Sequence, residues 1–118
     1  MEHNELVKKI INWMENKKAE EITHIDVAGK SDYTDSLIIC SGMGRLHLKA
    51  IAEHVISKCR ENGLKTISKE GLNSPNWILL DLGDIVIHIF DRDTRDYYKI
   101  EELWNVKRKT QMVNKDEE

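Results

Sequence analysis

Two closely spaced aspartates are the residues of this sequence best suited to catalysis. Asp91 and Asp93 directly follow an apolar run. Carboxylates at the end of a strand can hold Mg²⁺ for phosphoryl transfer if a third one, such as Asp26 or Asp81, joins them. Either Asp91 or Asp93 is also a suitable cap for a short helix over residues 94–98. We favour the cap, and keep a metal-dependent enzyme as the alternative.

The segment Gly42-Met43-Gly44 lies between an apolar run and a helical pattern, where helix amides can bind a phosphate. It lacks a third glycine and a Gly-Lys-Ser/Thr ending, so it matches neither nucleotide-binding fingerprint. We therefore interpret it as a tight turn. Cys40 and Cys59 lie in apolar surroundings and are predicted to be buried free thiols. No serine or cysteine stands in a recognisable nucleophile motif.

Five histidines raise the question of a metal site. His47 and His54 are seven residues apart on one predicted helix face, about 10 Å along its axis, which is too far to share one ion. His24 and His88 belong to different strands, and no Cys-x-x-Cys or His-Glu-x-x-His motif is present. We interpret the histidines as solvated or hydrogen-bonded. The sequence thus predicts no metal, no cofactor and no enzymatic activity.

A binding surface is the remaining option. Trp77 opens an apolar run just after Pro75, where an exposed position is plausible, and exposed aromatics commonly anchor protein interfaces. Tyr97, Tyr98 and Trp104 follow, and core packing would explain any one of these aromatics equally well. A strand edge beside such a residue is also a place where the strand of another chain can add.

These side chains are positioned by a predicted β-hairpin. Residues 76–82 and 85–90 are apolar, β-branched runs joined at the turn pair Gly83-Asp84. The first run is apolar almost throughout, so we expect both of its faces to be covered. The second run alternates isoleucines with other residues.

The other predicted elements surround this hairpin. Residues 36–41 contain a continuous apolar run bounded by polar residues, which is typical of a central strand covered on both faces. Trp13 is expected in the core. The elements are a helix over 5–16 capped by Asn4, strands over 22–27 and 36–41, a helix over 46–62 ended by Gly63, a strand over 64–68, the hairpin, and helical segments over 94–98 and 98–104. The order α-β-β-α-β-β-β-α predicts a single α/β domain over residues 1–105, a mixed sheet flanked by helices, with a polar tail over 106–118.

The composition and charge of the chain argue against several classes of protein. A chain of 118 residues is sufficient for one domain with its own core. Its apolar runs are far shorter than the roughly 20 residues that cross a bilayer, and no signal-peptide pattern is present, so we expect a cytoplasmic protein without a membrane partner. The net charge of −3 argues against a general nucleic-acid binder.

Several segments together resemble the ribosomal silencing factor family, also called Iojap. The similarity extends from about Leu6 to Trp104 and includes a specific pattern, Trp-x-x-x-Asp-x-Gly-Asp-x-x-x-His. The segments are residues 17–22, 34–42, 70–72, 77–88, 97–98 and 103–104.

The resemblance implies a homodimer with a nucleotidyltransferase-like α/β fold that has lost catalytic activity. It implies binding to the fourteenth protein of the large ribosomal subunit, which blocks joining of the small subunit and represses translation, particularly in starvation. Members also assist large-subunit maturation or act in organelles, and direct DNA binding is not expected.

The positions that match the family pattern suggest a partner-binding surface. Asp81 and Asp84 could meet basic groups of the ribosomal protein. The surface is expected to include Trp77, Asp81, Leu82, Asp84, His88 and Tyr98. Two alternatives stay open: a metal-dependent nucleotidyltransferase-like enzyme using Asp91 and Asp93, and a dimerisation module whose partner is not ribosomal.

Overall fold

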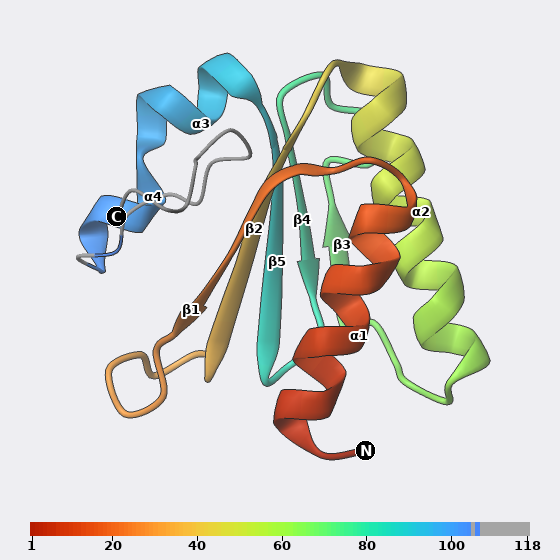
Figure 1. Ribbon diagram of the computed structural model, residues 1–118, viewed down its shortest axis with the longest axis vertical. Helices are drawn as coiled ribbons and strands as arrows, with labels where there is room; N and C mark the ends of the chain where they lie inside the picture. Colours follow the sequence, from red (N-terminus) through yellow and green to blue (C-terminus); the bar gives the residue numbers. More distant parts are fainter. Residues whose placement is uncertain (105, 107–118) are drawn as a thin grey trace, which may run out of the picture.

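The computed structural model describes residues 1–104 and 106, which form one five-stranded sheet with helices on both faces (Figure 1). The elements are α1 (His3–Asn16), β1 (Glu20–Asp26), β2 (Ser36–Gly42), α2 (Arg45–Glu61), β3 (Ser68–Glu70), β4 (Trp77–Asp81), β5 (Ile85–Asp91), α3 (Arg92–Tyr98) and α4 (Ile100–Leu103). The predicted α/β class and element order are confirmed. The helical segments predicted over 94–98 and 98–104 correspond to α3 and α4, which are separated by Lys99, whose backbone is left-handed.

The strands lie in the order β1-β2-β5-β4-β3. The pair β2–β5 is parallel and the other neighbouring pairs are antiparallel, so the sheet is mixed as predicted. Every residue of β2 is buried, which confirms it as a strand covered on both faces. The predicted hairpin is formed by β4 and β5, with Trp77 opposite Phe90 and Asp81 opposite Val86. No helix in the described part of the chain is long and apolar enough to cross a bilayer.

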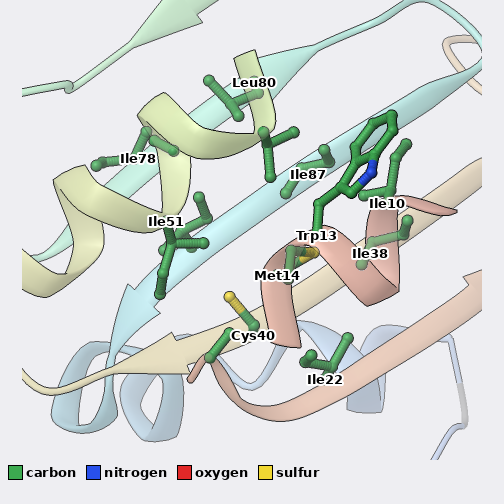
Figure 2. Close-up of a cluster of buried hydrophobic side chains, with 14 of the residues drawn as sticks. Ile10, Trp13, Met14, Ile22, Ile38, Cys40, Ile51, Ile78, Leu80 and Ile87 are labelled. Atoms are coloured by element: carbon green, nitrogen blue, oxygen red, sulfur yellow. The ribbon is translucent and has the colours of Figure 1, made fainter. Parts of the chain in front are cut away.

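Helices α1 and α2 cover one face of the sheet and build the larger core (Figure 2). Ile10 of α1 and Ile51 of α2 are fully buried there with Ile38 and Ile87 of the central strands. Trp13 is also buried, as predicted. The buried residues of α1 and of α2 recur every three or four positions, so each helix buries one face against the sheet.

Both cysteines are free and buried, which confirms the prediction. Burial raises the pKa of the Cys40 thiol to about 12. A thiol in such surroundings stays protonated at neutral pH and is a poor nucleophile.

Arg95 connects α3 and α4 to the opposite face of the sheet. Its side chain is fully buried, and its Nε donates to the Glu101 carboxylate at 2.6 Å. Its Nη1 and Nη2 donate to the hydroxyls of Ser41, at 2.9 Å, and Thr23, at 3.0 Å. One guanidinium thereby bridges both short helices and the strands β1 and β2.

Two predicted element boundaries are wrong. Glu2, rather than Asn4, caps α1, because its carboxylate accepts the Glu5 amide at 3.3 Å and the helix already begins at His3. The predicted strand over 64–68 is replaced by β3, which begins at Ser68. Leu64 cannot start a strand because its amide is bonded to the Cys59 carbonyl, which extends the end of α2.

The boundary between domain and tail was predicted after residue 105, and the next residue, Val106, packs against the domain. Val106 is partly buried against the apolar residues under α3 and α4, and its amide donates to the Glu101 carbonyl at 3.0 Å. The remainder of the predicted tail, 107–118, and residue 105 lie outside the described residues.

Candidate binding surface

Four aromatic rings from β4, β5 and α3 gather on the sheet face opposite α1 and α2. We call them the aromatic cluster: Trp77, His88, Phe90 and Tyr98. The Trp77 ring lies at its centre, with centroid distances of 4.9 Å to Tyr98, 5.0 Å to Phe90 and 5.8 Å to His88. These distances are within the range of favourable aromatic pairs. The structure therefore brings together three predicted contact residues and adds Phe90.

The strand β4 turns Trp77 toward this face. Ile78 and Leu80 are fully buried on the helix-covered face, whereas Trp77 and Leu79 are only partly buried on the other. The expectation that both faces of this run are covered is therefore wrong. The Trp77 amide also donates to the Ser74 hydroxyl at 3.2 Å, which ties the start of β4 to the preceding turn.

A hydrogen bond orients the Trp77 ring. Its indole N–H donates to Nδ1 of His88 at 3.0 Å, so this nitrogen carries no proton. Burial lowers the pKa of His88 to about 4, although the charge of Glu101 acts in the opposite direction. The imidazole is therefore neutral at pH 7. Because His88 is almost fully buried, its role is to position Trp77 from beneath.

The depressed pKa of His88 should make the fold sensitive to acid. An unfolded histidine binds its proton near pH 6.5, whereas His88 in the folded protein binds it only near pH 4. The contribution of His88 to the free energy of unfolding is fully present above pH 6.5. It is lost as the pH falls toward 4, and the loss reaches about 3 kcal/mol. Urea unfolding of the wild-type and His88→Asn proteins across this range measures it.

The His88→Asn protein keeps an oxygen acceptor for the indole and removes the titration. It should lose less stability on acidification than the wild type. Its remaining loss would come from His24 and His54, whose pKa values are also lowered by burial, and from Glu20, whose pKa is lowered by its hydrogen bond to Arg92. Equal losses in the two proteins would show that His88 does not control the acid response.

A pocket of about 490 Å³ opens beside Trp77 and Tyr98. Its walls come from β4, the start of α3 and the turn between β3 and β4, and include Glu70, Gly71, Ser74, Asn76, Leu79 and Thr94. Tyr97 is 79% exposed and packs edge-on against Tyr98 at 5.0 Å. An exposed aromatic rim beside a partly apolar pocket is the usual form of an interface anchor point.

Gly71 shapes one wall of this pocket. Its φ of +77° is left-handed, and a Cβ here would collide with the Trp77 carbonyl oxygen. We expect Gly71→Ala to lower the free energy of unfolding by about 1–3 kcal/mol. Gly29→Ala is the matched control, because Gly29 has a φ of +79° with open space around it. Urea unfolding should show the larger loss for Gly71→Ala, and equal losses would contradict the collision.

The other predicted contact residues lie at the opposite end of β4. Asp81 uses its carboxylate to accept the Gly83 amide at 2.8 Å, Leu82 packs partly against the helix-covered core, and Asp84 is exposed. Asp81 lies four residues after Trp77 along the strand, which is a distance of about 13 Å. The six predicted contact residues thus form two groups rather than one continuous patch.

The carboxylates of the enzyme hypothesis are not brought together. Asp91 caps α3 by accepting the Thr94 amide at 2.8 Å, which confirms the cap. Asp26 and Asp81 lie at the other end of the sheet, and the strand length from Val86, opposite Asp81, to Asp91 is roughly 16 Å. Among residues 1–104 and 106, no three metal-binding side chains are grouped.

Hydrogen bonds to other parts of the protein hold His24 and His47, whereas the buried Nε2 of His54 has no hydrogen-bond partner among the described residues. His24 lies on the α1 side of the sheet and bonds to the Ser36 hydroxyl at 2.9 Å, on the face opposite His88. His47 accepts the Met43 amide at 2.9 Å and bonds to the Lys17 carbonyl at 2.7 Å. The Gly42-Met43-Gly44 segment is therefore a turn held by His47, as interpreted from the sequence.

The comparisons with known proteins agree on one family. Residues 1–118 match the family described as "Ribosomal silencing factor during starvation". The chain is 39% identical over 99 residues to the protein named ribosomal silencing factor RsfS of Haemophilus influenzae, a match that covers 84% of this chain and 97% of that one. The chain belongs to the ribosomal silencing factor family.

Further relatives extend the agreement to the fold. The RsfS protein of Bacillus subtilis is 39% identical over 90 residues, covering 76% of each chain. A crystal structure of a Chromobacterium violaceum protein superposes with a TM-score of 0.88 at 32% identity, covering 97% of this chain and 95% of that one. The resemblance seen in the sequence is thus confirmed, and the family name associates the chain with ribosomes and translation rather than with an enzymatic reaction.

Sequence reasoning missed Phe90, Leu79 and the pocket. Phe90 could have been found, because it is two residues from His88 on the same strand and so faces the same side. The pocket is lined both by the turn around Gly71 and by Thr94 of α3, and no local sequence pattern indicates that these segments meet at one cavity.

Proposed function

We propose that this protein binds the large ribosomal subunit through its fourteenth ribosomal protein, prevents the small subunit from joining, and so represses translation. The aromatic cluster beside its pocket carries the proposal, since it supplies a partly exposed tryptophan and an exposed tyrosine on a rigid strand-and-helix support. Membership of the ribosomal silencing factor family supports it.

Steric exclusion is enough to explain the proposed effect. The protein measures 40 × 34 × 25 Å. These dimensions far exceed the gap between two ribosomal subunits whose surfaces are in contact. A body of this size on the joining face of one subunit excludes the other without any chemical step. Affinity for the large subunit, rather than turnover, then sets the strength of repression.

Two parts of the surface have different roles in this proposal. The aromatic cluster and Tyr97 provide apolar contact area, which contributes most to affinity. The exposed Asp84, with Asp81 beside it, faces basic groups of the partner and contributes to orientation and the rate of association. The proposal therefore predicts a docking face that extends along both ends of β4.

We also propose that the protein is cytoplasmic and that it forms a homodimer when it is not on the ribosome. Neither DNA nor a membrane has a role in this proposal. Sedimentation-equilibrium analysis measures the dimer directly.

Co-sedimentation with separated ribosomal subunits tests the proposed partner. Purified protein should migrate with large subunits and not with small subunits or with joined ribosomes. Migration with small subunits, or with neither subunit, from a protein whose circular dichroism shows it to be folded, would refute the proposal.

A further inference from the structure

A second pocket, of about 390 Å³, lies between the end of α2 and the edge strand β3. Three of its lining residues are cationic: Arg60, Lys65 and Lys69. Thr66 adds a hydroxyl group to the same lining. Because the net charge of the chain is −3, this cluster of three positive charges differs from the average surface.

The three cations are available to a ligand. Within residues 1–104 and 106, none of them forms an ion pair, and all three are exposed. The nearby carboxylate of Glu61 is already paired with Lys58 at 3.4 Å. Arg60 also complements the negative end of the α2 dipole, but Lys65 and Lys69 lie beyond the helix, so the dipole does not explain them.

We propose that this pocket binds a backbone phosphate of ribosomal RNA on the large subunit. A guanidinium, two ammonium groups and a hydroxyl are the donors that proteins use to hold phosphate oxygens. The inference rests on the proposed function, because it assumes that the aromatic cluster has placed the protein on the large subunit, whose surface is rich in phosphates.

The position of the pocket relative to the aromatic cluster supports this reading. Lys69 lines the cationic pocket, and the next residue, Glu70, lines the pocket beside Trp77. Consecutive residues of a strand point to opposite faces, so β3 presents one side to each surface. The two pockets therefore adjoin across the edge strand β3, and a partner that extends around this edge would contact both.

The overall negative charge is consistent with a contact of this size. One pocket neutralises one or two phosphates, which adds affinity to an existing docking contact. It does not make the protein a general RNA binder, because the net charge of the whole chain is −3.

The test is the salt dependence of binding to purified large subunits. The triple variant Arg60→Gln, Lys65→Gln, Lys69→Gln is compared with a control that loses the same charge elsewhere: Lys8→Gln, Lys9→Gln, Lys30→Gln. We expect the first variant to bind about tenfold more weakly at about 50 mM salt, and its slope of log affinity against log salt to be shallower by about 1. The control should keep the wild-type slope.

Equal affinities and equal slopes for the two triple variants would overturn the phosphate contact while leaving the proposed function intact. If the wild type does not bind large subunits at all, the proposed function fails, and the phosphate contact, which depends on docking to the large subunit, fails with it.

Discussion

Replacing Arg95 with alanine is expected to lower the free energy of unfolding by about 3–5 kcal/mol. The guanidinium is fully buried and donates to one carboxylate and two hydroxyls from three other elements. Its removal leaves the Glu101 carboxylate, only 2% exposed, without its cation. Urea unfolding measures the loss, and α3 and α4, which carry Tyr98 and Trp104, should be the first elements to loosen.

A matched double variant separates the buried charge from the packing. Arg95→Met with Glu101→Leu removes both charges and keeps apolar volume, so it should be more stable than Arg95→Ala. A loss below about 1 kcal/mol for Arg95→Ala alone would show that the ion pair does not hold the two helices to the sheet.

Trp77→Ala is expected to weaken binding to the large subunit by about 2 kcal/mol or more, which is roughly 30-fold. The indole contacts Phe90, Tyr98 and His88 and lines the larger of the two pockets, so its removal takes away the centre of the proposed docking face. Sedimentation binding curves with purified large subunits measure the change in dissociation constant.

Tyr98→Ala provides a second measurement, because Tyr98 is 47% exposed and its truncation disturbs the fold less. Leu46→Ala is the control: Leu46 is 74% exposed on α2, which covers the other face of the sheet. Binding should fall for Trp77→Ala and Tyr98→Ala but not for Leu46→Ala. Unchanged binding by both folded aromatic variants would remove the aromatic cluster from the interface.

The fold could be predicted largely because its signals are local. The centre of β2, Leu37 to Cys40, is apolar without interruption, and only a strand covered on both faces buries all four residues. The α2 stripe of Leu48, Ile51, Val55 and Cys59 follows helical spacing, and all four are buried. The same rule failed for β4, because a run of apolar residues does not distinguish a buried face from a partly exposed one.

The site could be predicted only in part because it depends on distant contacts. The family resemblance identified Trp77, His88 and Tyr98, and the structure shows that they meet around one ring. Arg95 was not identified, since an arginine between polar residues is typical of a solvated helix face. Its hydroxyl partners lie 54 and 72 residues away in sequence, a relation that no local pattern contains.

Light scattering during re-association of purified ribosomal subunits tests the central claim most directly. When large subunits are preincubated with the wild-type protein, fewer of them should join small subunits, and the fraction that joins should decrease as the protein concentration rises. The same concentrations of Trp77→Ala should have little effect. Full re-association while the wild-type protein remains bound to the large subunit would contradict the account, because it would show that the bound protein does not occupy the joining surface.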